Sequence, residues 1–420
     1  MNKMKLPDGW KEAELKNYFS RLTRKNNEGN TNVLTISAQH GLISQQEFFN
    51  KSIASEDKSN YFLLERGDFS YNKSYSAGYP FGAVKSLEKY DKGIVSPLYI
   101  CFKRTTENKC PEYFLQYFEA GLANKAICSV AQEGARNHGL LNISTGDFFK
   151  IKVVVPPLAE QQKIADILCE QDKIISLKQK LLEQKQQQKK WLMQKLLEVP
   201  YTNADCEEKF SLGGVVINKS EWKKEKLGNL LEFKNGINAD KEKYGYGIKM
   251  ISVMDILSDN PITSDSIKSS VEISDNELKT YSVNYGDILF QRSSENYEDA
   301  GSSNVYTDGK HTVTFSGFVI RGKKKADYEP LCLNAILKTD SNRSQIRKKA
   351  AGAQHINIGQ DSLKSIQIYL PSLPEQKIIA QVLSTADKEI ALLKSSIEQE
   401  KQKKKSLAQL LLTGTVRVKI

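Results

Sequence analysis

Four short polar clusters hold the side chains of this 420-residue sequence that could do chemistry on another molecule. Together with one further lysine they are Asn72, Lys73, Ser74 and Tyr75; Arg136, Asn137 and His138; Gln291, Arg292 and Ser293; Gln354 and His355; and Lys323. Arginine matches the edge of guanine, asparagine and glutamine match adenine, and lysine and serine more often hold phosphates. The clusters are therefore candidates for reading bases, although a solvated turn explains any single member at least as well.

No pattern in the sequence predicts catalysis. There is no GxxxxGK[ST] phosphate loop, and Pro156-Pro157 lacks the flanking residues of the [DNS]-P-P-[FYW] tetrapeptide of adenine methyltransferases. Pro7-Asp8 with Glu14-Leu15-Lys16 resembles a nuclease signature, but the spacing is too tight for two strands to bring both carboxylates to one metal. With only four histidines and no CxxC pair, we expect no zinc site.

The composition favours an acidic partner. The sequence has 61 Lys+Arg against 50 Asp+Glu, a net charge of +11, and nucleic acid is the usual partner of such a chain. No apolar run approaches the roughly 20 residues of a membrane helix, and the N-terminus has no apolar segment of a secretory signal. We therefore expect a cytoplasmic protein whose six scattered cysteines are reduced and mostly buried.

The elements that must position these clusters are repeated within the chain. Pro156–Leu197 aligns without gaps with Pro371–Leu412, and close to half of the aligned positions are identical. The regions upstream correspond more weakly, for example Gly67-Asp68 with Gly286-Asp287. The repeated segments are similar, which predicts that both have the same role. The upstream regions differ, which predicts two related but distinct roles.

Each similar segment predicts one long helix. Pro156-Pro157 and Pro374 suit a helix start, and Gly414 reads as a C-terminal cap. A helix of about 40 residues is about 60 Å long and too narrow to be stable alone, so we expect the two to pair as an antiparallel coiled coil. The alternative is that each packs on its own domain. The predicted seam consists of Ile164, Leu168, Ile175, Leu182 and Leu192 and of Ile379, Leu383, Ile390, Ile397 and Leu407.

The divergent regions predict an α+β fold. Strands are expected at Val33–Ile36, Val95–Phe102, Val313–Ile320 and Ile366–Leu370, and helices begin at Pro111 and Pro330. The expected architecture is two similar α+β domains separated by two long helices, with a pseudo-two-fold internal repeat. Its layout is a first domain over 1–155, a helix over 156–198, a linker over 199–219, a second domain over 220–370, and a second helix with a tail over 371–420.

The repeated segments resemble a known family. P-P-L-A-E-Q-Q-K-I-A-D-I-L (Pro156–Leu168), P-S-L-P-E-Q-K-I-I-A-Q-V-L (Pro371–Leu383) and L-L-T-G-T-V-R-V (Leu411–Val418) are similar to conserved regions of type I restriction–modification specificity subunits (HsdS). Tyr71–Ser76 with Gly134–Gly139 resembles their target-recognition domains. The resemblance covers the whole chain.

The resemblance implies a non-catalytic DNA-specificity subunit. Each recognition domain would read one half of a bipartite, asymmetric site in double-stranded DNA, and the helices would set the gap and dock two modification (HsdM) subunits. Those subunits would bring S-adenosylmethionine and methylate adenine N6, and optionally two restriction (HsdR) subunits would add ATP- and Mg-dependent cleavage. The alternatives are a self-contained methyltransferase or nuclease with unrecognised motifs, and a coiled-coil scaffold unrelated to DNA.

Overall fold

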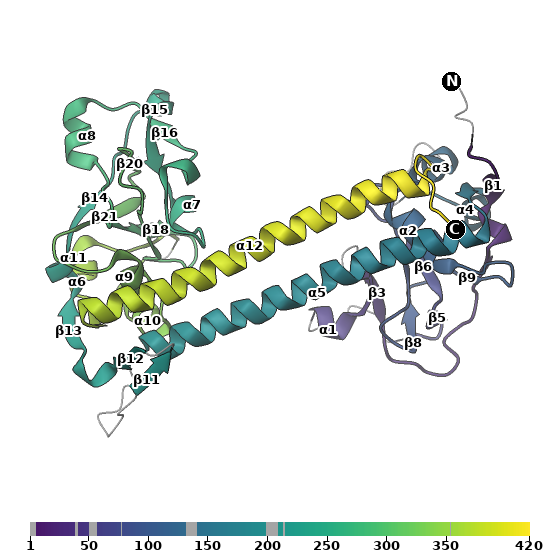
Figure 1. Ribbon diagram of the computed structural model, residues 1–420, viewed down its shortest axis with the longest axis horizontal. Helices are drawn as coiled ribbons and strands as arrows, with labels where there is room; N and C mark the ends of the chain where they lie inside the picture. The colour runs from purple at the N-terminus through teal and green to yellow at the C-terminus, as the bar shows by residue number, and fades with distance from the viewer. Residues whose placement is uncertain are drawn as a thin grey trace. The chain divides into compact units, whose positions relative to one another are not determined.

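The computed structural model describes residues 6–37, 41–49, 57–76, 78–131, 141–198, 209–212, 215–352 and 354–420. The chain divides into two compact units, one of Met1–Gln179 with Ser396–Ile420 and the other of Lys180–Ser395. Each unit contains a mixed region of strands and short helices together with one part of each of two long helices, α5 (Leu158–Leu197) and α12 (Leu373–Leu412) (Figure 1). The predicted α+β class is confirmed.

The first unit is built on a four-stranded antiparallel sheet in the order β2-β9-β6-β7. Short antiparallel pairs join β1 to β10, β3 to β4 and β5 to β8. The bounds are β1 Lys11–Glu14, β2 Phe19–Arg21, β3 Leu34–Ser37, β4 Gly41–Ser44, β5 Phe62–Glu65, β6 Phe69–Asn72, β7 Ala83–Ser86, β8 Lys92–Val95, β9 Ile100–Arg104, β10 Lys152–Val155, α1 Gln45–Phe49, α2 Pro111–Glu119, α3 Asn124–Val130 and α4 Thr145–Lys150.

The second unit repeats this plan, with a four-stranded antiparallel sheet in the order β14-β21-β17-β19 and a β13–β23 pair in the place of β1–β10. β15 also pairs with β16 and, in parallel, with β20. The bounds are β11 Lys209–Leu212, β12 Val215–Asn218, β13 Lys223–Lys226, β14 Leu231–Asn235, β15 Tyr244–Ile251, β16 Ser270–Val271, β17 Ile288–Gln291, β18 Ser293–Ser294, β19 Ser303–Val305, β20 Thr314–Phe315, β21 Val319–Lys324, β22 Ile356–Asn357, β23 Gln367–Leu370, α6 Leu227–Leu230, α7 Val253–Ile256, α8 Asp275–Tyr281, α9 Pro330–Leu337, α10 Asp340–Lys348 and α11 Gln360–Lys364.

Two strand predictions were wrong in extent. The stretch predicted as one strand over Val95–Phe102 is the end of β8, a turn and the start of β9. The turn is closed by the Tyr99 amide, which donates to the Ser96 carbonyl at 3.1 Å. Pro97 lies in this turn, and proline has no N–H with which to extend a sheet ladder. Likewise, Val313–Ile320 is divided at Ser316-Gly317, where the chain leaves β20 and enters β21.

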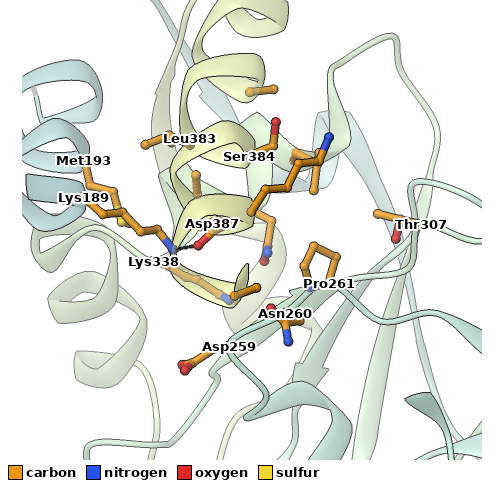
Figure 2. A pocket seen from close by; sticks show the side chains of 16 residues that line it. Lys189, Met193, Asp259, Asn260, Pro261, Thr307, Lys338, Leu383, Ser384 and Asp387 are labelled. Carbon is orange, nitrogen blue, oxygen red and sulfur yellow. Dashed lines mark hydrogen bonds and ion pairs between the residues drawn. The ribbon is translucent and has the colours of Figure 1, made fainter. Parts of the chain in front are cut away.

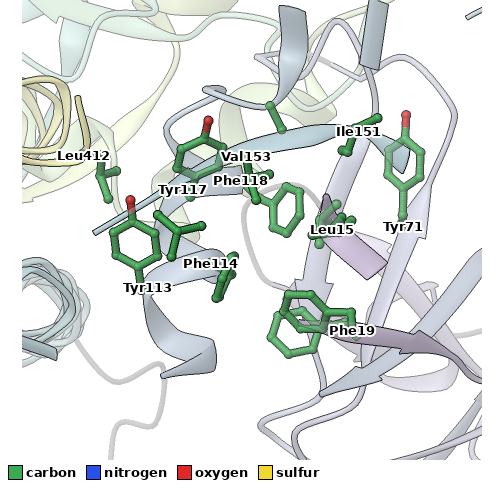
Figure 3. Close-up of a cluster of buried hydrophobic side chains, with 14 of the residues drawn as sticks. Leu15, Phe19, Tyr71, Tyr113, Phe114, Tyr117, Phe118, Ile151, Val153 and Leu412 are labelled. Carbon is green, nitrogen blue, oxygen red and sulfur yellow. The ribbon is translucent and has the colours of Figure 1, made fainter. Parts of the chain in front are cut away.

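The core of the first unit lies between its sheet, α2 and the beginning of α5. Phe19 packs edge-on against Phe69, Phe102 and Phe114, with ring centroids 5.1 to 5.3 Å apart (Figure 3). Such pairs stabilise by about 0.5–1.5 kcal/mol beyond the area they bury. Ile164 and Leu168 of α5 and Leu411 and Leu412 of α12 belong to the same buried cluster, so the two helices form part of this core.

The long helices begin and end at the residues that their sequence punctuation indicates. α5 begins directly after Pro156-Pro157, and α12 ends before Gly414, which has a φ of +72° and donates its amide to the Leu411 carbonyl. Positive φ is readily adopted by glycine and closes the last turn. Proline at the start of both helices and Gly414 at the end of α12 therefore agree with the ends that the sequence predicted.

The two helices run antiparallel in each unit. In the first, Lys178 and Gln171 of α5 both bind the Glu400 carboxylate, at 2.7 Å each, and Lys404 binds Asp172 at 2.7 Å. In the second, Lys185 binds Glu389 at 2.8 Å. Because partners further along α5 lie earlier in α12, the pair is antiparallel, as predicted.

The predicted seam is buried more completely in α12 than in α5. Ile164, Leu168 and Leu192, and likewise Ile379, Leu383, Ile390 and Ile397, are buried, whereas Ile175, Leu182 and Leu407 are only partly so. Ion pairs between the helices add to this apolar packing. Two stretches rich in lysine and glutamine, Lys185–Lys190 and Lys401–Lys405, could by their composition contact phosphates. Lys185, Lys189 and Lys404 of these stretches are each paired with a carboxylate on the facing helix, which favours helix pairing for these three lysines.

Candidate DNA-recognition surfaces

Two of the polar clusters in the second unit lie together although they are about 60 residues apart in sequence. Strand β18, which follows Gln291-Arg292, pairs with β22, so that Ser293 lies opposite Asn357 and Ser294 opposite Ile356. The Ile358 amide donates to the Arg292 carbonyl at 3.0 Å. Gln354 and His355 directly precede β22, and the structure therefore places them beside the Gln291–Ser294 tract. We name this the second recognition surface.

The members of this surface differ in how freely they can meet a ligand. Gln291 is buried, and its side-chain amide donates to the Ser293 carbonyl at 3.0 Å. Arg292 is partly buried and donates from Nη1 to the Gly317 carbonyl at 3.3 Å. Gln354 and His355 are exposed. In this structure Gln354 and His355 are thus the accessible members of the surface, and Gln291 and Arg292 shape the loop beneath.

The sequence analysis missed an exposed aromatic side chain on this surface. Phe318 is 62% exposed, and its carbonyl accepts the Arg292 amide at 2.8 Å, so it lies beside the cluster. An exposed aromatic ring beside an arginine suits contact with bases or sugars. The only signal for it was the Ser316-Gly317 dipeptide, which marks a break in the predicted strand but not which way the next side chain faces.

Lys323 does not belong to this surface. Along β21, Val319 lies opposite Gln291, whereas Gly322 lies opposite Ile288 at the start of β17. Lys323 is therefore at the other end of the strand, exposed and opposite Glu232 of β14. A phosphate contact by Lys323 stays a prediction, but the structure separates it from the residues around Arg292.

The corresponding surface of the first unit is only partly described. Asn72 ends β6 and accepts the Ser74 amide at 3.0 Å, while Tyr75 is 65% exposed. Lys73 accepts the Leu141 amide at 3.1 Å, which is the counterpart of the bond between Ile358 and Arg292. This polar tract, Asn72–Ser76, is the first recognition surface. Arg136, Asn137 and His138 lie outside the described residues, just before Leu141.

The Gly-Asp dipeptides that precede both surfaces have a structural role. Asp287 accepts the amides of Asn284 and Lys324 at 2.9 Å each, and Asp68 accepts the Glu65 amide at 2.8 Å and the Arg24 guanidinium at 2.9 Å. Burial raises the pKa of both carboxyls, and the amide donors oppose that rise. Each aspartate therefore fixes the turn that starts the strand leading to its recognition surface.

Both units present a polar surface on the same kind of scaffold. Among the described residues no group of three or more His, Cys, Asp or Glu side chains could hold a metal ion. Over the same part of the chain, no helix is long and apolar enough to cross a membrane. What recurs in both units is an antiparallel sheet that presents a polar tract after its third strand, pinned by a buried aspartate.

Comparison with protein families decides the identity of this arrangement. The type I restriction modification DNA specificity domain matches the chain twice, over residues 7–186 and 219–402. The chain belongs to this family. It is a specificity subunit of a type I restriction–modification system with two specificity domains in tandem, and the resemblance drawn from the repeated motifs is confirmed.

Individual relatives agree with this assignment. The putative type I restriction enzyme MjaX specificity subunit of Methanocaldococcus jannaschii is 26% identical over 431 residues, which cover 99% of this chain and 95% of that protein. The MjaVIII specificity subunit of the same organism is 26% identical over 356 residues, 78% of this chain and 75% of the relative.

Solved structures share the fold. A chain from work on complex assembly and conformational transition of the type I R-M system aligns with a TM-score of 0.58 at 16% identity and covers 99% of this chain and 100% of its own length. The S subunit of a type I system from M. genitalium aligns with a TM-score of 0.55 at 12% identity and covers 98% of each chain.

Proposed function

We propose that this specificity subunit reads a bipartite, asymmetric site in double-stranded DNA, with each recognition surface contacting one half. The observation that supports this is the repeated placement of different polar residues. In both units the tract follows the third strand in the sheet order and is tied to the segment before a short helix, by the Leu141–Lys73 bond in one and the Ile358–Arg292 bond in the other. The same scaffold with different side chains is what reading two different half-sites requires.

In this proposal the chain supplies specificity, and the chemistry belongs to partner subunits. Two modification subunits bring S-adenosylmethionine and methylate adenine, and restriction subunits add ATP, Mg and cleavage. Adenine methylation needs the base to be flipped out, so one subunit must hold the flanking DNA while another takes the base. A function on DNA also places the complex with the chromosome, in the cytoplasm.

The long helices offer a repeated site for docking such partners. Leu177 of α5 is 65% exposed and Leu392 of α12 is 72% exposed, and the two occupy the same position in the internal repeat. Two equivalent exposed leucines fit two copies of one partner. We infer that each anchors one modification subunit.

This docking gives a direct prediction. Leu177→Asp and Leu392→Asp should each weaken association with the modification subunit by about tenfold or more, because a charge replaces an apolar anchor in the buried centre of an interface. Calorimetric titration of the full chain with the modification subunit measures both affinity and stoichiometry. Gln184→Asp, at an exposed position of α5, is the matched control and should bind like the natural chain. Equal affinity in all three variants would rule out both leucines as anchors.

The proposed function is tested by a methylome. The chain is expressed with its modification subunit in a bacterium without adenine methylation, and N6-methyladenine is mapped across the genome. We expect one new motif of two half-sites with a fixed gap, and no methylation by either protein alone. Methylation by this chain alone would show instead that it is a self-contained methyltransferase. A soluble, DNA-binding complex with no sequence preference would favour the scaffold alternative.

The same assay tests the two surfaces separately. Gln354→Ala with His355→Ala should relax or abolish specificity in one half-site only, and Tyr75→Ala or Arg136→Ala in the other half only. A lost bidentate base contact costs about 1–3 kcal/mol of discrimination, so the affected position should accept other bases. Lys323→Ala should leave both half-sites unchanged, since that residue lies away from Arg292. A change in both halves from either set of variants would contradict independent reading.

A further inference from the structure

A pocket of about 330 Å³ lies in the second unit, between α9, α12, the end of α5 and the loop around Pro261 (Figure 2). Much of its lining is apolar and includes Met193, Leu331 and Leu383. The charged residues at its wall are Lys189, Lys338, Asp387, Asp259 and Lys388. Neither recognition surface contributes a residue to it.

No carboxylate of the described residues forms an ion pair with the Lys338 ammonium. Lys338 directly follows α9 and is partly buried, and among the described residues no ion pair or hydrogen bond of its side chain occurs. The neighbouring carboxylates are already engaged, because Asp387 pairs with Lys189 and Asp259 lies 3.5 Å from the Lys394 ammonium. A partly buried cation without a partner is costly in an apolar setting.

The internal repeat shows what the equivalent place looks like when the charge is balanced. α2 and α9 both begin at a proline, so Lys338 corresponds to Glu119 in the first unit. There Glu119 forms an ion pair with Lys85 of β7. Lys85 lies opposite the second residue of β6, and Asn304 of β19 lies opposite the second residue of β17, so Asn304 takes the position of Lys85. In the second unit, the position of the acidic Glu119 is held by the basic Lys338, and the position of Lys85 is held by a neutral asparagine.

Asn304 instead shapes the pocket. Its side-chain amide donates to the carbonyls of Asp255, Ser258 and Asn260 at 2.9 to 3.2 Å. These bonds fix the loop that leads into Pro261 and forms one wall. Asparagine at this position thus leaves the strand without the charge of Lys85. Its side chain instead stabilises the loop that forms the pocket wall beside Lys338.

The electrostatics favour an incoming negative charge. Burial lowers the pKa of Lys338, the nearby Lys189 lowers it further, and Asp387 and Asp259 oppose that shift. An anion bound against the ammonium would replace the missing counter-ion. A charge-assisted hydrogen bond in a partly desolvated place is about twice as strong as a neutral one.

We propose that this pocket binds a small amphipathic anion, whose acidic group pairs with the Lys338 ammonium and whose apolar body lies against Met193, Leu331 and Leu383. A volume of about 330 Å³ is in the range of small-molecule sites, which are mostly apolar with a few polar groups that fix the orientation. Of the three lysines in the wall, Lys189 is paired with Asp387 and Lys388 is exposed, so the partly buried Lys338 ammonium is the charge that selects a ligand with an acidic group. The inference goes beyond the proposed function, because it requires neither DNA nor a partner subunit.

The test uses 8-anilinonaphthalene-1-sulfonate, a fluorescent amphipathic anion, on the full chain. We expect saturable binding at one site. Lys338→Met keeps the aliphatic length and removes the charge, and should weaken binding at least about tenfold, equivalent to about 1.4 kcal/mol. Lys388→Met, at an exposed lysine of the same pocket, should bind within about twofold of the natural chain. The uncharged N-phenyl-1-naphthylamine should bind Lys338→Met at least as tightly as the natural chain.

A second variant keeps the test decisive. Ala391→Trp adds a bulky ring at an exposed position of α12 that lines the pocket, so it should block the site without disturbing the core. Thermal unfolding of each variant checks that it is folded. Absence of a saturable site, equal sulfonate affinity in Lys338→Met and the natural chain, or undiminished binding to Ala391→Trp would each overturn the proposal. Affinity that arises only with the modification subunit present would assign the pocket to a protein interface instead.

Discussion

Glu160→Ala is expected to lower the free energy of unfolding of the first unit by about 3 kcal/mol. Glu160 is 1% exposed, and its carboxylate accepts a hydrogen bond from the Trp10 indole at 3.0 Å. The same carboxylate forms a bidentate ion pair with the Arg417 guanidinium. Arg417 also donates to the Asp8 carbonyl at 3.0 Å. One carboxylate of α5 therefore fixes the segment before β1 and the segment after α12 together. Its removal leaves a buried indole N–H unpaired and the guanidinium without its partner.

The internal repeat supplies the controls. Glu375 occupies the same position in α12, but it is less buried, and among the described residues its hydrogen-bond donors are the Ser372 amide and hydroxyl and the Asn218 amide. Glu375→Ala should therefore cost about 1 kcal/mol, as the loss of a helix cap does. Trp10→Phe should be more costly than Trp222→Phe, because the Trp222 indole N–H has no hydrogen-bond partner among the described residues.

Urea denaturation followed by circular dichroism measures these differences in the full chain. The two units can unfold in separate transitions, and the Glu160 variant should move only one of them. Arg417→Ala should move the same transition by less, because its side chain is 43% exposed and therefore screened by solvent. Equal losses for Glu160→Ala and Glu375→Ala would contradict the role assigned to the Glu160 cluster.

Long-range similarity within the sequence made the architecture predictable. The gapless alignment of Pro156–Leu197 with Pro371–Leu412 required the same structure twice, and the flanking prolines and Gly414 gave the ends. The antiparallel pairing followed because a helix of this length and narrow seam needs a partner. The ion pairs that set the register, such as Lys178 with Glu400, were not predictable, because any of several lysines could meet any of several carboxylates.

The sequence predicted which residue types form the recognition surfaces, but not which of these residues are exposed or lie together. Side-chain type marked Gln291 and Arg292 for contact with bases, but the burial of Gln291 depends on a loop closed by residues about 60 positions later. Lys323 is near Phe318 in sequence, yet β21 carries it to the other end of the sheet. Local patterns report what a residue can bind, whereas strand pairing decides which residues share a surface.

The length of the paired helices is expected to set the gap between the two half-sites. Both α5 and α12 pass from one compact unit into the other, at Gln179–Lys180 and Ser395–Ser396. Inserting seven residues after Gln179 and seven after Ser395 adds two helical turns, about 10.5 Å, to both helices. At about 3.4 Å per base pair, the recognised gap should grow by about three base pairs while both half-sites stay unchanged.

The matched insertion is required because the helices are held in register by charge. Lys178 with Glu400 lies on one side of the insertion points and Lys185 with Glu389 on the other, so lengthening both helices keeps both pairs. A seven-residue step also nearly preserves the helix face. Four residues inserted near Gln186 in α5 alone would move Lys189 away from Asp387 and should destabilise the pair. The methylome of the modified complex gives the answer, since a changed half-site with an unchanged gap would show that the helices do not measure the spacing.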